Sequence, residues 1–228
     1  MKMKFCYFLC LFASAAAHLQ SCKEIHKEYI VKLQDIILPA PGKSGGKALM
    51  EALNERKSVR TFTGENLTMQ QLSDLLWAGN GINRQGEKKR TAPSARNTQE
   101  IDIYVALPGG LYLYDAEINI LKQIHNRDIR KICGTQDFVA DAPVNLVFVA
   151  NMAKLGKKDA DRIKDSDLLY PYANTGFIAQ NIYLYCASEN LGCVIRGLIP
   201  RKKLASEMGL RPNQVIILSH SIGIPMIK

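Results

Sequence analysis

The sequence has few of the features that mark non-globular proteins. Only 7% of its 228 residues are aromatic, one residue is tryptophan, and it has 16 glycines and 9 prolines. Apolar residues make up 47% and charged residues 22% of the chain, which excludes intrinsic disorder, a collagen-like repeat and a coiled coil. About 200 residues remain after a predicted leader, enough for one sizeable core.

Several well-known catalytic motifs are also absent. The sequence contains no G-x-G-x-x-G, no Walker loop, no G-x-S-x-G and no H-E-x-x-H. His220 stands between two serines without a nucleophile-elbow context, so it is expected to be structural rather than a general base. No uncharged run after residue 21 is long enough to cross a bilayer.

Cysteine is too sparse for a disulfide framework. Three cysteines fall in the predicted folded part of the chain: Cys133, Cys186 and Cys193. Their odd number and the absence of C-x-x-C predict free or buried thiols and no metal site.

The N-terminus has the pattern of a signal peptide. A basic start, Met1–Lys4, precedes thirteen uncharged residues, Phe5–Ala17, which are too few to span a membrane and typical of a signal-peptide core. Leu19–Cys22 resembles a bacterial lipobox, which implies a bacterial source and lipidation of Cys22. The alternatives are cleavage after the alanines at 15–17, giving a secreted form, or no processing.

Three segments are expected along the chain. Residues 1–21 are the predicted signal peptide of a lipoprotein, 22–46 a Gly/Pro-containing tether, and 47–228 one folded domain. We therefore expect an exported protein that is anchored to the membrane by lipid and faces the periplasm or the cell exterior.

The chain is basic, with 30 Lys+Arg against 21 Asp+Glu and a net charge of +9. This balance suits nucleic acid, anionic lipid or an anionic cofactor. The longest basic runs, 88–90 and 201–203, lack aromatic neighbours or a recognition motif, so nucleic acid is not the expected partner. A lipid or nucleic-acid binder remains a third class of function, and steep salt dependence of binding would reveal it.

Hydrophobic periodicity predicts interleaved strands and helices. Strands are expected at 101–107, 111–114, 144–149, 192–195 and 215–218, and helices at 47–56, 68–79, 117–141 (with breaks), 172–189 and 200–208. Thr68 and Gln71 have the spacing of a capping box, and the helix at 172–189 is apolar around much of its surface. This arrangement without repeats predicts a single α+β layered sandwich.

The segment Arg56–Arg60 carries three cations and a hydroxyl within five residues. In an extended backbone, Arg56, Ser58 and Arg60 point to the same side and could converge on one phosphate. On composition alone, an exposed basic helix end is the favoured interpretation of the segment. The polar stretch Arg90–Gln99 by itself indicates only a loop.

Taken together, four motifs in order resemble the nitroreductase-like FMN oxidoreductases over residues 47–226. The motifs are Arg56–Arg60, Pro93-Ser94-Ala95-x-Asn97-x-Gln99, the helix from Asn174-Thr175-Gly176 to Leu184, and Leu191–Gly197 followed by Gly223–Pro225. Arg90–Ser94 and Gly110–Asp115 look closest to the branch that includes azoline dehydrogenases of peptide-toxin maturation.

This resemblance implies a nitroreductase-like sandwich with a mainly antiparallel central sheet flanked by helices. It also implies an obligate homodimer with one FMN in each of two interface sites. Arg56, Lys57, Ser58 and Arg60 would hold the phosphate and the ribityl chain. The partner subunit would contribute Pro93, Ser94, Ala95 and Asn97 to line the flavin. The backbone amides of Val194, Ile195, Arg196 and Gly197 would face the isoalloxazine.

The resemblance further implies hydride transfer through flavin N5 between a donor such as NAD(P)H and a small conjugated acceptor, with ping-pong kinetics. The acceptor would be a nitroaromatic, a quinone or a similar electrophile. No side chain is required as acid or base, so no catalytic residue is named, because the cofactor carries the chemistry. The alternative function is a non-enzymatic FMN-binding surface lipoprotein.

Overall fold

The computed structural model describes residues 33–226. The predicted signal peptide and the lipidation site Cys22 lie outside these residues. Within the described part of the chain, no helix is both long and apolar enough to cross a membrane.

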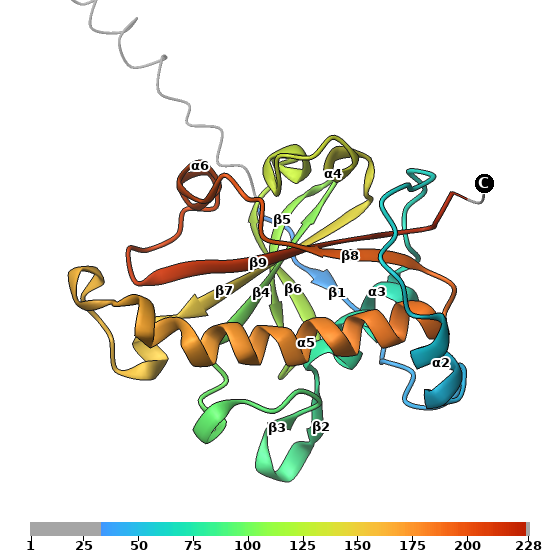
Figure 1. Cartoon of the computed structure of the whole chain (residues 1–228), viewed down its shortest axis with the longest axis horizontal. Coiled ribbons are helices and arrows are strands. Elements are labelled where there is room, and N and C mark those ends of the chain that lie inside the picture. Colours follow the sequence, from blue (N-terminus) through green and yellow to red (C-terminus); the bar gives the residue numbers. More distant parts are fainter. Residues whose placement is uncertain (1–32, 227–228) are drawn as a thin grey trace, which may run out of the picture. The chain divides into compact units, whose positions relative to one another are not determined.

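A seven-stranded sheet forms the centre of the fold, in the order β1-β6-β5-β4-β7-β9-β8 (Figure 1). Every pairing between neighbouring strands of this sheet is antiparallel. The strands are β1 (Ile36–Ile37), β4 (Ile101–Leu107), β5 (Gly110–Asp115), β6 (Ile120–His125), β7 (Val144–Asn151), β8 (Gly192–Arg196) and β9 (Gln214–Gly223). A separate hairpin consists of β2 (Ile82–Arg84) and β3 (Lys89–Arg90).

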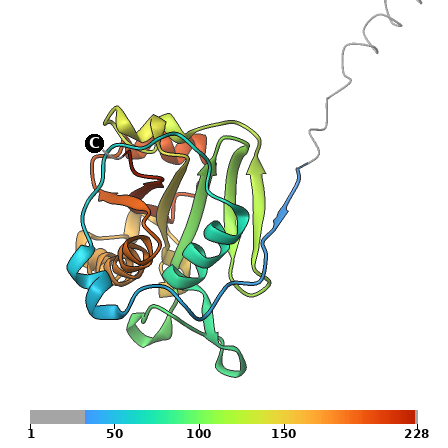
Figure 2. The ribbon, with the colours of Figure 1, turned by 90° about the vertical axis from the view of Figure 1, so that its right-hand side faces the viewer.

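Helices cover both faces of the sheet (Figures 1 and 2). Residues of α3 and α5 belong to one hydrophobic cluster with the sheet, and residues of α4 and α6 belong to the other. The helices are α2 (Leu49–Glu55), α3 (Met69–Asn80), α4 (Phe138–Asp141), α5 (Leu169–Ser188) and α6 (Arg201–Glu207). The predicted α+β sandwich with an antiparallel central sheet is therefore confirmed.

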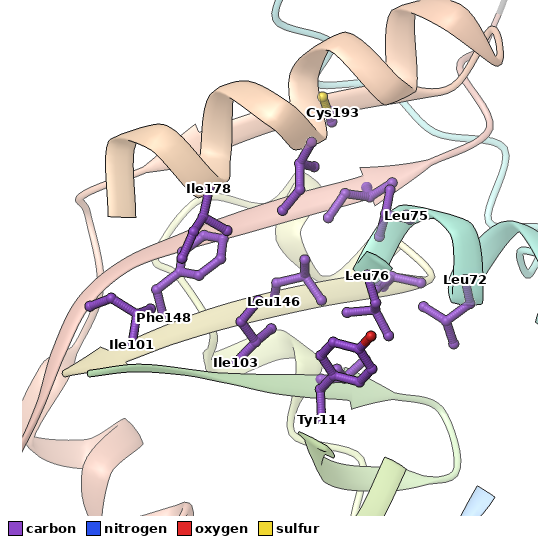
Figure 3. Close-up of a cluster of buried hydrophobic side chains, with 14 of the residues drawn as sticks. Leu72, Leu75, Leu76, Ile101, Ile103, Tyr114, Leu146, Phe148, Ile178 and Cys193 are labelled. Carbon is purple, nitrogen blue, oxygen red and sulfur yellow. The ribbon is translucent and has the colours of Figure 1, made fainter. Parts of the chain in front are cut away.

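The fold has one hydrophobic core on each face of the sheet, because successive side chains of the central strands point to opposite faces. On β7, Leu146 and Phe148 face α3 and α5, whereas Val147 and Val149 face α4 and α6. All four side chains are fully buried, as expected of a strand covered on both faces. Figure 3 shows the first of these clusters between the sheet and the two helices.

The predicted capping box begins α3. The Gln71 amide donates to Thr68 Oγ1 (3.2 Å), and the Thr68 amide donates to Gln71 Oε1 (2.9 Å). Capping of this kind stabilises a helix start by about 1 kcal/mol. It positions the buried stripe of α3, whose members are Leu72, Leu75 and Leu76.

The helical prediction for 117–141 is wrong over its first third. Residues 120–125 form β6, which pairs with β5, and only Phe138–Asp141 is α-helical. Asn119, with φ of 52°, turns the chain back before β6. The apolar spacing of this segment fits a helix locally, but antiparallel pairing with β5 determines its structure.

The predicted tether also needs correction where it is described. Ile36 and Ile37 form β1 on β6, and Leu38 is buried in the core. Ser73 on α3 donates to the Pro39 carbonyl (2.6 Å), and Asp74 accepts from the Gly42 amide (2.7 Å). Residues 36–42 therefore belong to the folded unit, because they close the edge of the sheet and cover α3.

Candidate functional site

The segment Arg56–Arg60 leaves α2 with an extended backbone and runs beside β8. The Val59 amide donates to the Cys193 carbonyl (2.9 Å), and further along Phe62 bridges to Pro225. The segment is thus held along the outer edge of the sheet, between β8 and the end of α5, in the extended form that convergence on one ligand requires.

A pocket of about 830 Å³ opens at this segment, within the range of small-molecule sites. We call it the basic pocket. Its lining includes Arg56, Lys57, Ser58, Arg60, Tyr183, Cys186, Asn190 and Cys193. All four residues that the sequence predicts as phosphate ligands therefore line one pocket.

The cations of the basic pocket have no carboxylate partners. Among residues 33–226, none of Arg56, Lys57 and Arg60 takes part in a salt bridge. Glu55 also lines the pocket, but its carboxylate is paired with Lys47 (2.6 Å). The three cations around this cavity therefore favour an anionic ligand, and arginine forks suit a phosphate in particular.

Tyr183 on α5 contacts two residues that line the pocket, Ser58 and Arg56. Its hydroxyl accepts a hydrogen bond from the Ile195 amide (3.0 Å) and lies 2.9 Å from Ser58 Oγ. Its ring lies under Arg56, whose Cζ is 5.3 Å from the ring centroid. The sequence placed Tyr183 within a motif but assigned it no role, since its partners are 12 and 125 residues away along the chain.

The second motif, Pro93–Gln99, forms a loop that includes one turn of 3₁₀-helix. Ser94 Oγ accepts from the Gln99 amide (3.0 Å), and Asn174 Oδ1 on α5 accepts from the Ala95 amide (3.3 Å). Ser94 thus closes the loop on itself, and Asn174 fixes the loop backbone against α5.

Three residues of this loop have a strained backbone conformation. Arg96, Asn97 and Gln99 have φ of 56°, 54° and 48°, in the left-handed region that non-glycine residues avoid. Each such residue costs on the order of 1–3 kcal/mol and persists only where its surroundings enforce it. Strain concentrated in one short loop is typical of functional sites.

The two motifs do not meet within one chain. The loop contacts α5 at Asn174, whereas the basic pocket touches α5 at Tyr183 and Cys186. Nine residues of helix separate Asn174 from Tyr183, the nearer of the two pocket residues, which corresponds to about 14 Å. No residue of Pro93–Gln99 lines the basic pocket.

The predicted flavin contacts of Val194, Ile195, Arg196 and Gly197 stay a prediction, and the strand pairing distinguishes the directions of their amides. The Cys193 carbonyl and the Ile195 amide point away from the sheet, to Val59 and Tyr183. Because backbone groups alternate along an antiparallel strand, the amides of Val194 and Arg196 point to β9 instead. Of the four residues, Ile195 has its amide on the pocket side, and Gly197 lies exposed beyond the strand.

The Arg196 side chain is directed away from the pocket. It is buried and donates to the Cys133 carbonyl (2.9 Å), Asn145 Oδ1 (3.0 Å) and Ser219 Oγ (2.9 Å). Burial lowers the pKa of Arg196 to about 10. Its hydrogen bonds link β7, β8 and β9, so the Arg196 side chain holds these three strands together.

Comparisons with known proteins agree with this geometry. Residues 53–224 match the sequence profile of the nitroreductase family. A protein of Methanocaldococcus jannaschii, named as a nitroreductase, is 31% identical over 180 residues, covering 75% of this chain and 88% of that protein. A crystal structure described as a nitroreductase of Ralstonia eutropha is 42% identical, with a TM-score of 0.78, covering 85% of this chain and 90% of that one.

A more distant structural relative was solved with a flavin. It is described as a nitroreductase from Desulfovibrio desulfuricans in complex with FMN, 19% identical with a TM-score of 0.57, covering 80% of this chain and 89% of that one. At this identity the likeness concerns the fold alone. From the profile match and the two closer relatives, we conclude that the chain belongs to the nitroreductase family and is an oxidoreductase.

Proposed function

We propose that the chain is an FMN-dependent oxidoreductase. It would transfer hydride through flavin N5 from a donor such as NAD(P)H to a small conjugated acceptor, a nitroaromatic or a quinone, with ping-pong kinetics. Family membership supports the reaction class, and the FMN complex of one structural relative supports the cofactor. The azoline-dehydrogenase branch remains a prediction from the sequence.

The observation that carries this proposal is the basic pocket. It offers three cations without a salt-bridge partner in the described part of the chain and a cavity of about 830 Å³, and these features fit a phosphorylated cofactor of the size of FMN. Bound FMN would supply a two-electron carrier that accepts and returns hydride.

The residues of this chain would bind and orient that cofactor. Arg56 and Arg60 would each donate charge-assisted hydrogen bonds to the phosphate. Ser58 would be held in place by Tyr183, whose hydroxyl is itself fixed by the Ile195 amide. Stacking over the Tyr183 ring restrains the Arg56 guanidinium before any ligand arrives, which lowers the entropic cost of binding.

The remaining part of the site would come from a second copy of the chain. Along α5, the residue that contacts the strained loop Pro93–Gln99, Asn174, lies about 14 Å from Tyr183 in the basic pocket, and no residue of the loop lines that pocket. We propose a homodimer in which Pro93, Ser94, Ala95 and Asn97 line the partner's flavin.

Turnover by the purified protein tests the proposed function. Protein reconstituted with FMN is mixed with NADH or NADPH under nitrogen, and the flavin absorbance is followed before and after a nitroaromatic or quinone is added. Bleaching by the donor and recovery with the acceptor are expected. Bound FMN that neither bleaches nor turns over would contradict the enzyme and favour the surface-binding alternative.

A further inference from the structure

Glu100 is an acidic residue inside the protein to which the proposed function gives no role. It directly precedes β4, and its side chain is fully buried. Within residues 33–226 it takes part in no salt bridge. Removing a carboxyl group from water is costly unless its oxygens are hydrogen-bonded, so the placement of Glu100 depends on the partners that the fold provides.

Both carboxyl oxygens of Glu100 have side-chain partners, one on α5 and one in the strained loop Pro93–Gln99. Asn174 Nδ2 on α5 donates to Oε1 (2.7 Å), and Thr98 Oγ1 in the loop lies 2.6 Å from Oε2. The main chain of Glu100 is fixed as well, because its carbonyl accepts from the Asn151 amide at the end of β7 (2.9 Å). Glu100 therefore connects the loop to α5 and to the central sheet.

The two partners of Glu100 both contact the backbone of Ala95. Asn174 Oδ1 accepts from the Ala95 amide (3.3 Å), and Thr98 Oγ1 lies 3.0 Å from the Ala95 carbonyl oxygen. Because the nitrogen of the Asn174 side chain is bound to Glu100, its oxygen is turned toward Ala95. The bond to Glu100 thus determines which atom of Asn174 meets the loop.

Apolar side chains accompany this network. Ile101, the residue after Glu100, and Ile178, one turn beyond Asn174 on α5, belong to the same hydrophobic cluster (Figure 3). Asn174 itself is only 2% exposed. Hydrogen bonds in such an environment compete little with water, so they hold their partners in one arrangement.

The network also accounts for the persistence of the strained backbone. The left-handed residues of the loop begin at Arg96, directly after Ala95, and two of them flank Thr98. Conformations of this kind persist only where the surroundings enforce them. Glu100 restrains Thr98 directly and Ala95 through Asn174, and so restrains the backbone on both sides of the first strained residues.

We propose that Glu100 is a positioning residue for the flavin, which acts through Asn174 and Thr98 on the loop Pro93–Gln99. This inference rests on the proposed function, in which that loop lines the partner's FMN. The carboxyl group itself touches no ligand. It holds the loop backbone in the conformation that the flavin would meet.

A double-mutant cycle on Glu100 and Asn174 tests this proposal. Glu100→Leu and Asn174→Leu each leave a buried polar group without its partner, so each should lower the free energy of unfolding. Each should also raise the Kd for FMN about tenfold, which corresponds to the loss of one hydrogen bond.

The double variant Glu100→Leu/Asn174→Leu separates positioning from stability. Two leucines replace both polar partners with apolar side chains, so the free energy of unfolding should recover toward that of the wild type. The Kd for FMN should stay raised, because neither polar group remains to orient the loop.

Ser73→Ala is the matched control for loss of a buried hydrogen bond. Ser73 is fully buried and donates to the Pro39 carbonyl (2.6 Å), outside the network of Glu100. This variant should be less stable than the wild type and should bind FMN with unchanged Kd.

Trypsin tests the hold on the loop without FMN. Arg96 is exposed in the loop, and proteolysis reports local opening of the backbone. Cleavage after Arg96, followed by mass spectrometry, should be several-fold faster in Glu100→Leu, in Asn174→Leu and in the double variant than in the wild type or in Ser73→Ala.

The outcomes distinguish this inference from the proposed function. Recovery of FMN affinity together with stability in the double variant would overturn it, as would single variants with the Kd and the Arg96 cleavage rate of the wild type. A wild type that binds no FMN would contradict the proposed function, and the flavin role of Glu100 would fall with it.

Discussion

At the scale of single residues, Arg56 is the side chain whose role is best defined by its surroundings. It lines the basic pocket, its guanidinium is stacked over Tyr183, and it has no salt bridge among the described residues. A cation held in this way is available to an anionic ligand, and we propose that Arg56 binds the phosphate of FMN.

Arg56→Ala should therefore weaken FMN binding with little effect on folding. Loss of one charge-assisted hydrogen bond costs about 1.5–3 kcal/mol, or roughly tenfold to a hundredfold in Kd. Titration of apoprotein with FMN, followed by quenching of flavin fluorescence, measures the change. Arg162→Ala is the matched control, because Arg162 is exposed, pairs only with Asp159 and lies outside the pocket. Equal affinities for the two variants would refute the assignment of Arg56.

The predictability of the site depends on where each residue's partners lie. The basic pocket could be predicted because Arg56–Arg60 is a contiguous motif. Tyr183 could not, because its role arises from contacts with Ser58 and Ile195 that only the folded chain creates. The different directions of the Ile195 and Arg196 amides could not be predicted, because sequence adjacency does not reveal which way a backbone amide points.

At the scale of elements, strong local signals were the most informative. Alternation predicted β4, an apolar run predicted β7, and the Thr68–Gln71 capping box predicted α3. The neighbouring strands β1 and β6 were missed because pairing with another strand, rather than local pattern, determines their structure.

The hairpin between β4 and β5 gives a test at this scale. Gly110 has φ of 139°, and a Cβ there would lie 2.2 Å from the His125 carbonyl oxygen, whereas a Cβ at Gly109 would meet only the Tyr112 hydroxyl at 3.3 Å. Gly110→Ala should lower the free energy of unfolding by on the order of 2–4 kcal/mol. Gly109→Ala should change it by about 0.5 kcal/mol or less.

Urea denaturation of the two glycine variants, monitored by circular dichroism, measures this difference. The pair is well matched because the positions are adjacent in one turn. Similar midpoints for both variants would mean that the hairpin relaxes easily and that its close backbone approach is unimportant.

At the scale of the whole molecule, α5 presents a large apolar surface to its surroundings. Four of its large side chains are exposed in the single chain: Leu169 (67%), Tyr170 (59%), Tyr172 (44%) and Phe177 (47%). An apolar face of this kind favours burial against a partner, and a two-fold axis is the commonest arrangement for a second copy.

We predict that the folded unit is a homodimer and that the dimer is needed to retain flavin. Size-exclusion chromatography with light scattering, read at protein and flavin wavelengths, should show a dimer that loses flavin on dilution. Phe177→Glu should shift the monomer–dimer equilibrium toward the monomer. Flavin should be released as the dimer dissociates. A monomer that carries stoichiometric FMN would be incompatible with a shared site.

The predicted export of the molecule has its own test. If the sequence Leu19–Cys22 directs lipidation, mass spectrometry of the mature protein from a bacterial host should find a diacylglyceryl group on an N-terminal Cys22. Cys22→Ser is expected to abolish membrane attachment. A mature chain that keeps Met1, or that begins at His18, would exclude lipidation at Cys22.

The central claim is that the basic pocket binds FMN. The most direct measurement is the visible absorption spectrum of the purified protein, recorded before and after addition of FMN and removal of unbound ligand. We predict flavin bands at up to one FMN per chain in the unaltered protein and their loss in the double variant Arg56→Ala/Arg60→Ala. A protein without flavin bands after FMN addition, or a double variant that retains full flavin content, would contradict the account.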